Sequence, residues 1–205
     1  MRRKDDEKEQ RIKEAVIEVA LEEGFGGASI SKIAKRAGVS PATVYIYHEN
    51  KECLLQNVYM ECAEELYSTL LSDVQDVQSK RNGRDLVDHL IRGYFNYMVQ
   101  NANQAGFVQQ FSSSPALTHN CSEICGFNRL MSLLQEWIDE DIFRPYSVIN
   151  VFSLLFNPVK MLAAGSLAYH TNAEAPLEEL IRITQSALLE DGADSENGKN
   201  GNVKR

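Results

Sequence analysis

Residues 30–49 read ISKIAKRAGVSPATVYIYHE, and this stretch decides how the first part of the chain folds. Ser29 is typical of a helix N-cap, and an apolar stripe with helical spacing follows it as far as Gly38. Ser40 and Pro41 open a second short helix, because proline fits the first helical position, where an N–H has no intrahelical partner. Gly38 supplies the left-handed turn between them. The stretch therefore predicts two short helices joined by a tight turn.

This arrangement is typical of a DNA-binding helix-turn-helix, but it also occurs as an ordinary helical hairpin in an all-α core. Ala34 is small enough for the second helix to cross closely, and Val44 fills the angle between the helices. The outward face of the second helix is polar and aromatic, where a core helix would be aliphatic. Such a face fits a major groove about 12 Å wide. We therefore favour the DNA-binding interpretation.

The charge distribution is compatible with DNA binding by one end of the chain. The chain has 205 residues and a net charge of −8, which excludes a generally basic nucleic-acid coat protein. Residues 1–51 carry a balance of +1, and the remainder carries −9. Within residues 29–51 the only acid is Glu49, against four basic residues. Phosphate contacts need one basic face only, and we expect Arg2–Lys4 to add a loose basic arm.

Helical periodicity continues along the whole chain, and strand signals are nearly absent. The predicted fold is all-α, with a three-helix N-terminal helix-turn-helix head and a C-terminal helical bundle of about six helices. The expected divisions are a DNA-binding domain at 1–50, an effector-binding and dimerisation domain at 51–190, and a disordered polar tail at 191–205.

The longest apolar stretch, residues 148–168, predicts a buried helix rather than a membrane span, because polar residues interrupt it. Pro158 either bends this helix or divides it into two. The N-terminus is polar and does not resemble a secretory leader. We therefore expect a cytoplasmic protein with reduced thiols and no membrane partner.

From Gly24-Phe25 through SISKIAKRAGVSPATVYIYHENKECLL, the sequence resembles the DNA-binding head of the tetracycline-repressor (TetR) family. The resemblance covers about the first quarter of the chain, and His48 stands where the family usually has phenylalanine. It implies a homodimeric transcription regulator without a cofactor, and it favours repression over activation. The residues that the resemblance assigns to DNA contacts are Ser29, Ser40, Pro41, Ala42, Thr43, Tyr45, Ile46, Tyr47 and Lys51.

The resemblance also implies dimerisation and ligand control. The last two long helices, expected at 146–170 and 176–190, would form a four-helix bundle with a second copy. A dimer would place its two recognition helices about 34–36 Å apart on a palindromic operator. A ligand that tilts the helix beginning near Lys51 would change this spacing. The residues expected at the dimer interface are Leu154, Leu155, Met161, Leu162, Leu177, Ile181 and Leu188.

Large flexible and aromatic side chains in the body predict a pocket for an apolar or aromatic small-molecule effector. Each of them is also typical of an ordinary core. The residues expected to bind this effector are Cys62, Leu66, Tyr94, Met98, Phe107, Phe111, Phe127, Met131, Phe152 and Phe156.

Other functions receive less support. His119, Cys121 and Cys125 could hold a metal or sense oxidation, but no fourth ligand is evident, and buried packing is the commoner use of helix-spaced cysteines. No catalytic motif is present, so we expect no enzyme. A regulator of the same fold without small-molecule control, an activator, and a helical protein–protein module remain open alternatives.

Overall fold

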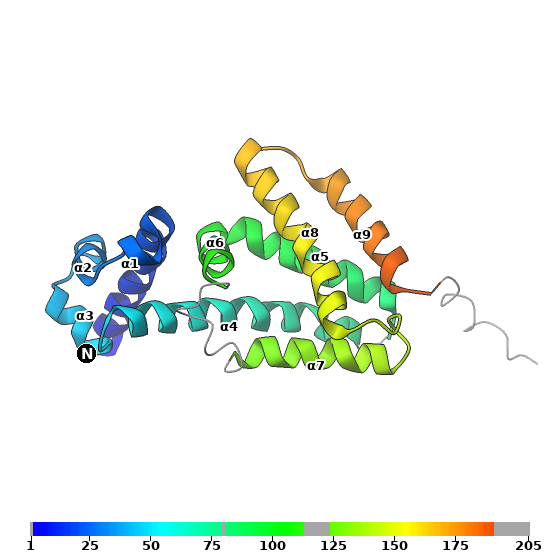
Figure 1. The fold of residues 1–205 in the computed structure, drawn as a ribbon, viewed down its shortest axis with the longest axis horizontal. Coiled ribbons are helices and arrows are strands. Elements are labelled where there is room, and N and C mark those ends of the chain that lie inside the picture. Colours follow the sequence, from blue (N-terminus) through cyan, green and yellow to red (C-terminus); the bar gives the residue numbers. More distant parts are fainter. Residues whose placement is uncertain (1, 79–80, 113–123, 191–205) are drawn as a thin grey trace, which may run out of the picture. The chain divides into compact units, whose positions relative to one another are not determined.

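The structure is a computed structural model that describes residues 2–78, 81–112 and 124–190, with side chains from residue 6 onward except at 76–78. Within these residues there are nine α-helices and no strand, which confirms the all-α prediction of three helices followed by six (Figure 1). The helices are α1 (Arg2–Gly27), α2 (Ile30–Ala37), α3 (Pro41–Tyr47), α4 (Lys51–Gln78), α5 (Gly83–Gln100), α6 (Ala102–Phe111), α7 (Cys125–Asp139), α8 (Val148–Tyr169) and α9 (Glu174–Leu188).

Some helix ends differ from the predictions for local reasons. Gly24 breaks the helical geometry of α1 with φ 70°, yet the helix resumes and ends at Gly27. The backbone of Arg2–Lys4 belongs to α1, so the expectation of a loose arm was wrong. Helix α9 begins at Glu174, before Pro176, because proline in the first turn interrupts no intrahelical hydrogen bond. Pro158 lies inside α8, which remains one helix.

The chain divides into two compact units, and the first comprises residues 1–71 and 96–130. In this unit α2 packs against both α1 and α3, and α6 packs against α1. Val16, Ile33, Ala34 and Val44 are fully buried where these helices meet. Burying such side chains stabilises the unit by about 1.5–3 kcal/mol for each large aliphatic group.

The second unit comprises residues 72–95 and 131–205. Helices α8 and α9 lie side by side in it and bury the sides that face each other. Arg92 of α5 forms ion pairs with Asp88 in its own helix and with Glu178 of α9. Trp137 and Phe143 pack edge to face with ring centroids 5.6 Å apart. The sequence assigned 51–190 to one effector-binding domain, and that functional division stays a prediction.

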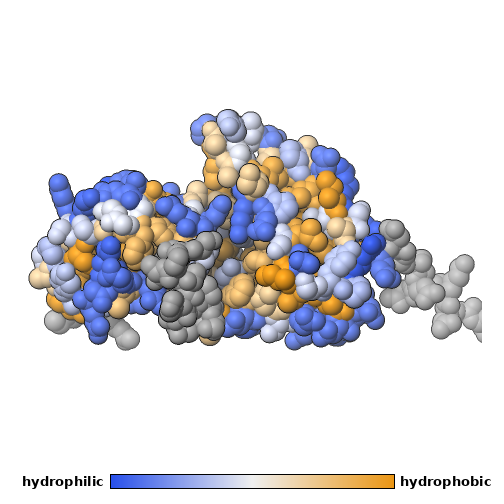
Figure 2. All heavy atoms as spheres, viewed as in Figure 1, coloured by the Kyte–Doolittle hydropathy of each residue, from blue (hydrophilic) through white to orange (hydrophobic). Residues whose placement is uncertain are grey.

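Helix α8 is long and apolar enough to cross a membrane by length and composition, with a mean hydropathy of 1.4 over its apolar window. Only 28% of that window is buried in the protomer, so the predicted buried helix is buried along one side only. Ile149, Leu154, Met161 and Leu167 are all exposed. Figure 2 shows hydrophobic side chains among hydrophilic ones over this part of the chain.

Candidate DNA interface and effector site

Two side-chain caps and one glycine build the helix-turn-helix, as the sequence predicted. Ser29 accepts a hydrogen bond from the Lys32 backbone N–H, and Ser40 accepts one from Thr43 at 3.1 Å. Gly38 has φ 67° and ψ 36°, and its backbone N–H donates to carbonyls of α2. Because a side chain is strained at such a φ, glycine is the residue type that suits this turn. These local interactions position α3 after α2.

Helix α3 turns one side to the core and the other to solvent. Val44 is fully buried against the rest of the head, while Ile46 is 76% exposed and Tyr45 is 56% exposed. Ala42 is also exposed. Thr43 and Tyr47 are half-buried, so neither is packed inside the molecule. This geometry leaves the outward face of α3 available to a duplex.

Several basic side chains of the head are already engaged by acidic ones. Arg36 contacts Glu22 at 2.7 Å and Glu18 at 2.8 Å, and Lys32 pairs with Glu23. The local excess of basic charge expected from residues 29–51 is therefore partly neutralised by glutamates of α1. This pairing leaves less free positive charge for phosphates than the sequence suggested.

Lys51, which the resemblance assigned to a phosphate, is engaged within the head. Its Nζ donates to the carbonyl oxygen of Phe25 at 3.2 Å and lies 4.9 Å from the centroid of the Phe25 ring. It therefore fastens the start of α4 to the end of α1. The contact with DNA phosphate stays a prediction, and Nζ would have to share its donors to make it.

His48 ends α3 and contacts α4. Its Nδ1 lies 3.2 Å from Nδ2 of Asn57, and burial lowers its pKa below the ordinary value. A lowered pKa favours the neutral ring at pH 7, and a neutral ring attracts phosphate less than a protonated one. The structure therefore favours packing over a phosphate contact for His48.

A buried lysine that the sequence analysis did not single out belongs to a hydrogen-bonded cluster between α1, α4 and α6. Lys13 of α1 donates to Glu61 at 2.8 Å and to Glu65 at 2.6 Å, both on α4. Gln104 of α6 donates to the other oxygen of Glu65 at 3.2 Å. A signal was present, because Lys13 interrupts the buried stripe around Ile12, and a charge there needs partners.

The residues expected to bind an effector are divided between the two compact units. Cys62, Leu66 and Met98 are buried in the first unit, and Tyr94 and Phe156 are buried in the second. The remaining members are distributed in the same way, with Phe107, Phe111 and Phe127 in the first unit and Met131 and Phe152 in the second.

Within each unit these side chains pack against one another as core. The rings of Phe107 and Phe111 have centroids 4.8 Å apart, and Tyr94 meets Phe156 edge to face at 5.0 Å. Burial raises the pKa of the Cys62 thiol to about 12. Binding of an effector to this set stays a prediction, and an occupant would have to separate contacts that are made here.

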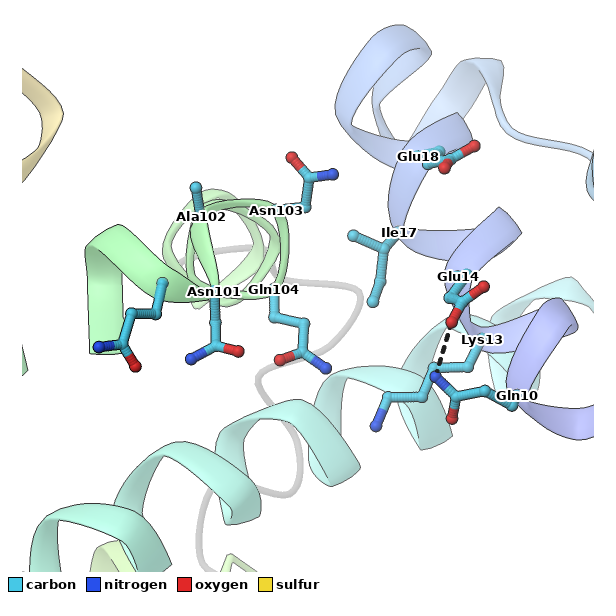
Figure 3. A pocket seen from close by; sticks show the side chains of 10 residues that line it. Gln10, Lys13, Glu14, Ile17, Glu18, Asn101, Ala102, Asn103 and Gln104 are labelled. Carbon is cyan, nitrogen blue, oxygen red and sulfur yellow. Dashed lines mark hydrogen bonds between the residues drawn. The ribbon is translucent and has the colours of Figure 1, made fainter. Parts of the chain in front are cut away.

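A polar cleft of about 420 Å³ lies in the first unit between α1 and the start of α6 (Figure 3). Gln10, Glu14 and Glu18 line it from α1, and Asn103 and Gln104 face them from α6. Gln10 donates to Glu14 across one helical turn at 2.9 Å. Amides and carboxylates favour water and polar solutes here, so this cleft is not the predicted apolar pocket.

Four of the residues expected at the dimer interface have little accessible surface in the single chain. Leu155, Leu177, Ile181 and Leu188 are buried between the helices of the second unit. Their assignment to the interface stays a prediction. The other three have accessible surface on α8: Leu154 and Met161 are exposed, and Leu162 is half-buried.

The proposed metal or redox cluster is largely outside the described residues, since His119 and Cys121 fall between 113 and 123. Cys125 is exposed at the start of α7. In the part of the chain that the structure describes, no group of three His, Cys, Asp or Glu side chains could hold a metal ion.

The fold and the exposed α3 define the class of protein, an all-α protein with an N-terminal helix-turn-helix. The family model described as "Bacterial regulatory proteins, tetR family" matches residues 12–58. The helix-turn-helix head is therefore similar in sequence to bacterial regulatory proteins of the TetR family.

Known proteins resemble both the sequence and the fold. The fatty acid metabolism regulator protein of Bacillus subtilis (strain 168) is 30% identical over 102 residues, which cover 50% of this chain and 51% of that protein. The matched segment thus spans about half the length of this curated relative.

Two solved structures share the fold. A TetR family transcription regulator from Marinobacter aquaeolei VT8 has a TM-score of 0.82 at 22% identity, covering 93% of this chain and 100% of its own. FadR from Bacillus subtilis in complex with stearoyl-CoA has a TM-score of 0.70 at 24% identity, covering 87% and 98%. These likenesses extend the agreement in fold beyond the head.

Proposed function

We propose that this chain is a homodimeric repressor that binds a palindromic operator through α3 and is released by an apolar small molecule. The observation that carries the proposal is the outward face of α3, which follows the Gly38 turn. Ile46 and Tyr45 are exposed on this face, while Val44 is buried on the opposite side and packs the helix against the head. Such a helix fits the major groove. A protein that acts on bacterial DNA in this way works in the cytoplasm.

The exposed side of α8 supports dimerisation. Leu154 and Met161 lie seven residues apart on one face, and Ile183 on the neighbouring α9 is also exposed. An apolar stripe of this length is costly in water and is typical of an interface. A second copy that covers it would bring two heads together for the two halves of a palindrome.

The relatives suggest the class of effector. One is a fatty acid metabolism regulator, and one structural neighbour is a complex with stearoyl-CoA. A long acyl chain is apolar and flexible, which agrees with the effector expected from the aromatic and aliphatic body. We therefore propose a long-chain acyl compound as the effector of this chain as well.

The aromatic packing in both units favours a second candidate, a regulator of the same fold without small-molecule control. Tyr94 and Phe156 pack edge to face, and an acyl chain that binds among these side chains would have to separate them. An effector must therefore open this core, whereas an uncontrolled regulator would keep it closed.

Operator binding tests both candidates. DNA selected from a random pool by the purified chain should yield a palindrome that the protein binds tightly. Stearoyl-CoA added to this complex should weaken it, with coenzyme A alone as the matched control. Release only by the acylated compound supports the ligand-responsive repressor, and no release by either supports the uncontrolled regulator. Failure to select any sequence would overturn the proposed function.

A further inference from the structure

The outward face of α3 carries no charge and is more apolar than the polar and aromatic face expected from the sequence. Ala42, Tyr45 and Ile46 have the spacing i, i+3 and i+4, which places them on one side of the helix. All three are exposed, and Ile46 is more exposed than its neighbours Tyr45 and Tyr47. No charged residue occurs between Pro41 and Tyr47. A groove that receives this face meets a branched aliphatic side chain near its centre.

The hydroxyl groups at the start of α3 are engaged with each other. Ser40 Oγ accepts a hydrogen bond from the Thr43 backbone N–H, and it lies 2.9 Å from Thr43 Oγ1. These two side chains therefore cap the helix and hold each other in place. Their capacity to form further hydrogen bonds with base edges is reduced.

Helix α3 also lacks the side chains that discriminate bases by paired hydrogen bonds. Arginine or lysine reads guanine, and asparagine or glutamine reads adenine, but none of these residue types occurs in PATVYIY. The cations Lys32 and Arg36 of the preceding helix are paired with glutamates of α1. Sequence readout by α3 must therefore depend strongly on apolar contact.

The thymine 5-methyl group is the apolar feature that the major groove presents. Contact between this methyl group and Ile46 would remove both from water, and this gain is available only where the operator carries thymine. Ala42 lies one turn earlier on the same face and leaves room for the base to approach. We propose that Ile46 is a specificity-determining residue that reads a thymine 5-methyl group in each half-site. This inference rests on the proposed function and specifies its base chemistry.

Replacing thymine by deoxyuracil in the selected operator tests the inference, because deoxyuracil pairs with adenine in the same way and lacks only the methyl group. Each thymine is replaced singly in one half-site, and binding is measured by fluorescence anisotropy. At one position the wild-type protein should bind about fourfold more weakly, which corresponds to one buried methyl group. Replacement in both half-sites should give roughly the square of that factor.

Substitution of Ile46 identifies the side chain that reads the methyl group. Ile46→Ala should weaken binding to the thymine operator, and the deoxyuracil operator should then bind no more weakly than the thymine operator. Because Ile46 is exposed, this variant should melt at the wild-type temperature. Tyr45→Phe is the matched control, since it changes a neighbouring exposed residue and should retain the full deoxyuracil effect.

Two outcomes would overturn the inference while leaving the proposed function intact. In one, every deoxyuracil operator binds the wild-type protein within about twofold of the thymine operator. In the other, the deoxyuracil effect persists unchanged in Ile46→Ala, so another residue reads the methyl group. Failure to select any sequence would instead overturn both the inference and the function on which it rests.

Discussion

The head and the α8–α9 pair are stabilised in different ways. In the head, α2 and α3 have eight and seven residues, and each begins with a serine whose side chain accepts a backbone N–H. Helices α8 and α9 have 22 and 15 residues and no side-chain hydrogen bond at their N-caps. A short helix buries little surface, so its ends contribute much of its stability, whereas a long helix depends on the residues buried along its side.

The same contrast applies to exposed hydrophobic residues. On α3, Ile46 lies on a short helix that local caps hold in place. On α8, Met161 is one of a row of exposed apolar residues along a long helix. A short uncharged face is suited to a DNA groove, and a long apolar face is suited to another protein surface.

A charge on the exposed side of α8 should produce the largest effect on function. Met161 is 74% exposed, so Met161→Glu should fold normally but place two carboxylates in the proposed interface. We expect a monomer whose operator affinity falls at least about 100-fold, because simultaneous binding of two half-sites is lost. Light scattering measures the mass, and anisotropy measures the affinity.

Ser132→Glu adds the same charge on an exposed position of α7 and should leave both quantities unchanged. A Met161→Glu protein that remains a dimer would show that this face of α8 is not the interface.

The hydrogen-bonded cluster of Lys13, Glu61 and Glu65 should lose different amounts of stability when the lysine or the two glutamates are replaced. Glu61→Gln combined with Glu65→Gln should lower the free energy of unfolding by about 2 kcal/mol, because Lys13 stays buried without a counter-charge. Lys13→Met should cost about 1 kcal/mol, since the freed glutamates are half-exposed and regain water. Urea unfolding measures both. Equal losses would indicate that burial of the lysine charge is not the dominant cost.

The same cluster should weaken in alkali. Burial alone would lower the pKa of Lys13, but the hydrogen bonds that Lys13 donates to Glu61 and Glu65 outweigh it and raise the pKa above the ordinary 10.5. Its contribution is therefore fully present below pH 10.5 and is lost as pH rises through the folded-state pKa. The stability difference between wild type and Lys13→Met should shrink in that window. A difference that grows with pH would contradict this sign.

Replacing glycine by alanine should affect stability differently at two positions of the head, Gly38 in the turn and Gly26 near the end of α1. Gly38→Ala should cost about 1.5 kcal/mol, because φ 67° is strained for any side chain, although an added Cβ would make only an ordinary contact with Arg11 Nη1 at 3.7 Å. Gly26→Ala, in a helical position with open space, should be neutral or stabilising by about 0.5 kcal/mol. Thermal unfolding followed by circular dichroism measures both. Equal effects would mean that the left-handed turn is not the cause.

The smallest effect should come from the cap of α3. Ser40→Ala removes the acceptor for the Thr43 N–H and should cost about 1 kcal/mol. Ser31→Ala, at an exposed position within α2, should change stability by less than about 0.5 kcal/mol. Urea unfolding of the two variants measures the difference. A Ser31→Ala loss as large as that of Ser40→Ala would deny any special contribution of the cap.

The head was predictable in detail because its determinants are local. Ser29, Gly38 and Ser40 act on backbone groups within a few residues of themselves, so the order of residue types was enough to locate α2 and α3. The pairing of Arg36 with Glu18 and Glu22 was not predicted, since it joins residues 14 and 18 positions apart on different helices. The basic face expected from the sequence is weaker for that reason.

The side of α8 that faces solvent could not be read from the sequence. Leu154 and Leu155 are adjacent and chemically identical, yet the first is exposed and the second is fully buried. An apolar helix with hydrophobic residues on several sides has no periodic pattern that selects one of them. The sequence therefore could not tell which of the expected interface residues are accessible on α8, and the interface itself stays a prediction.

By itself, the sequence determined the helical class, the order of the helices, the two capped helices and the glycine turn between them, because each depends on neighbouring residues. The tertiary structure alone decided which hydrophobic side chains of the body became core, which charges found partners and which face of α8 stayed in water. Those outcomes depend on packing between segments distant in the chain, and local spacing carries no information about that packing.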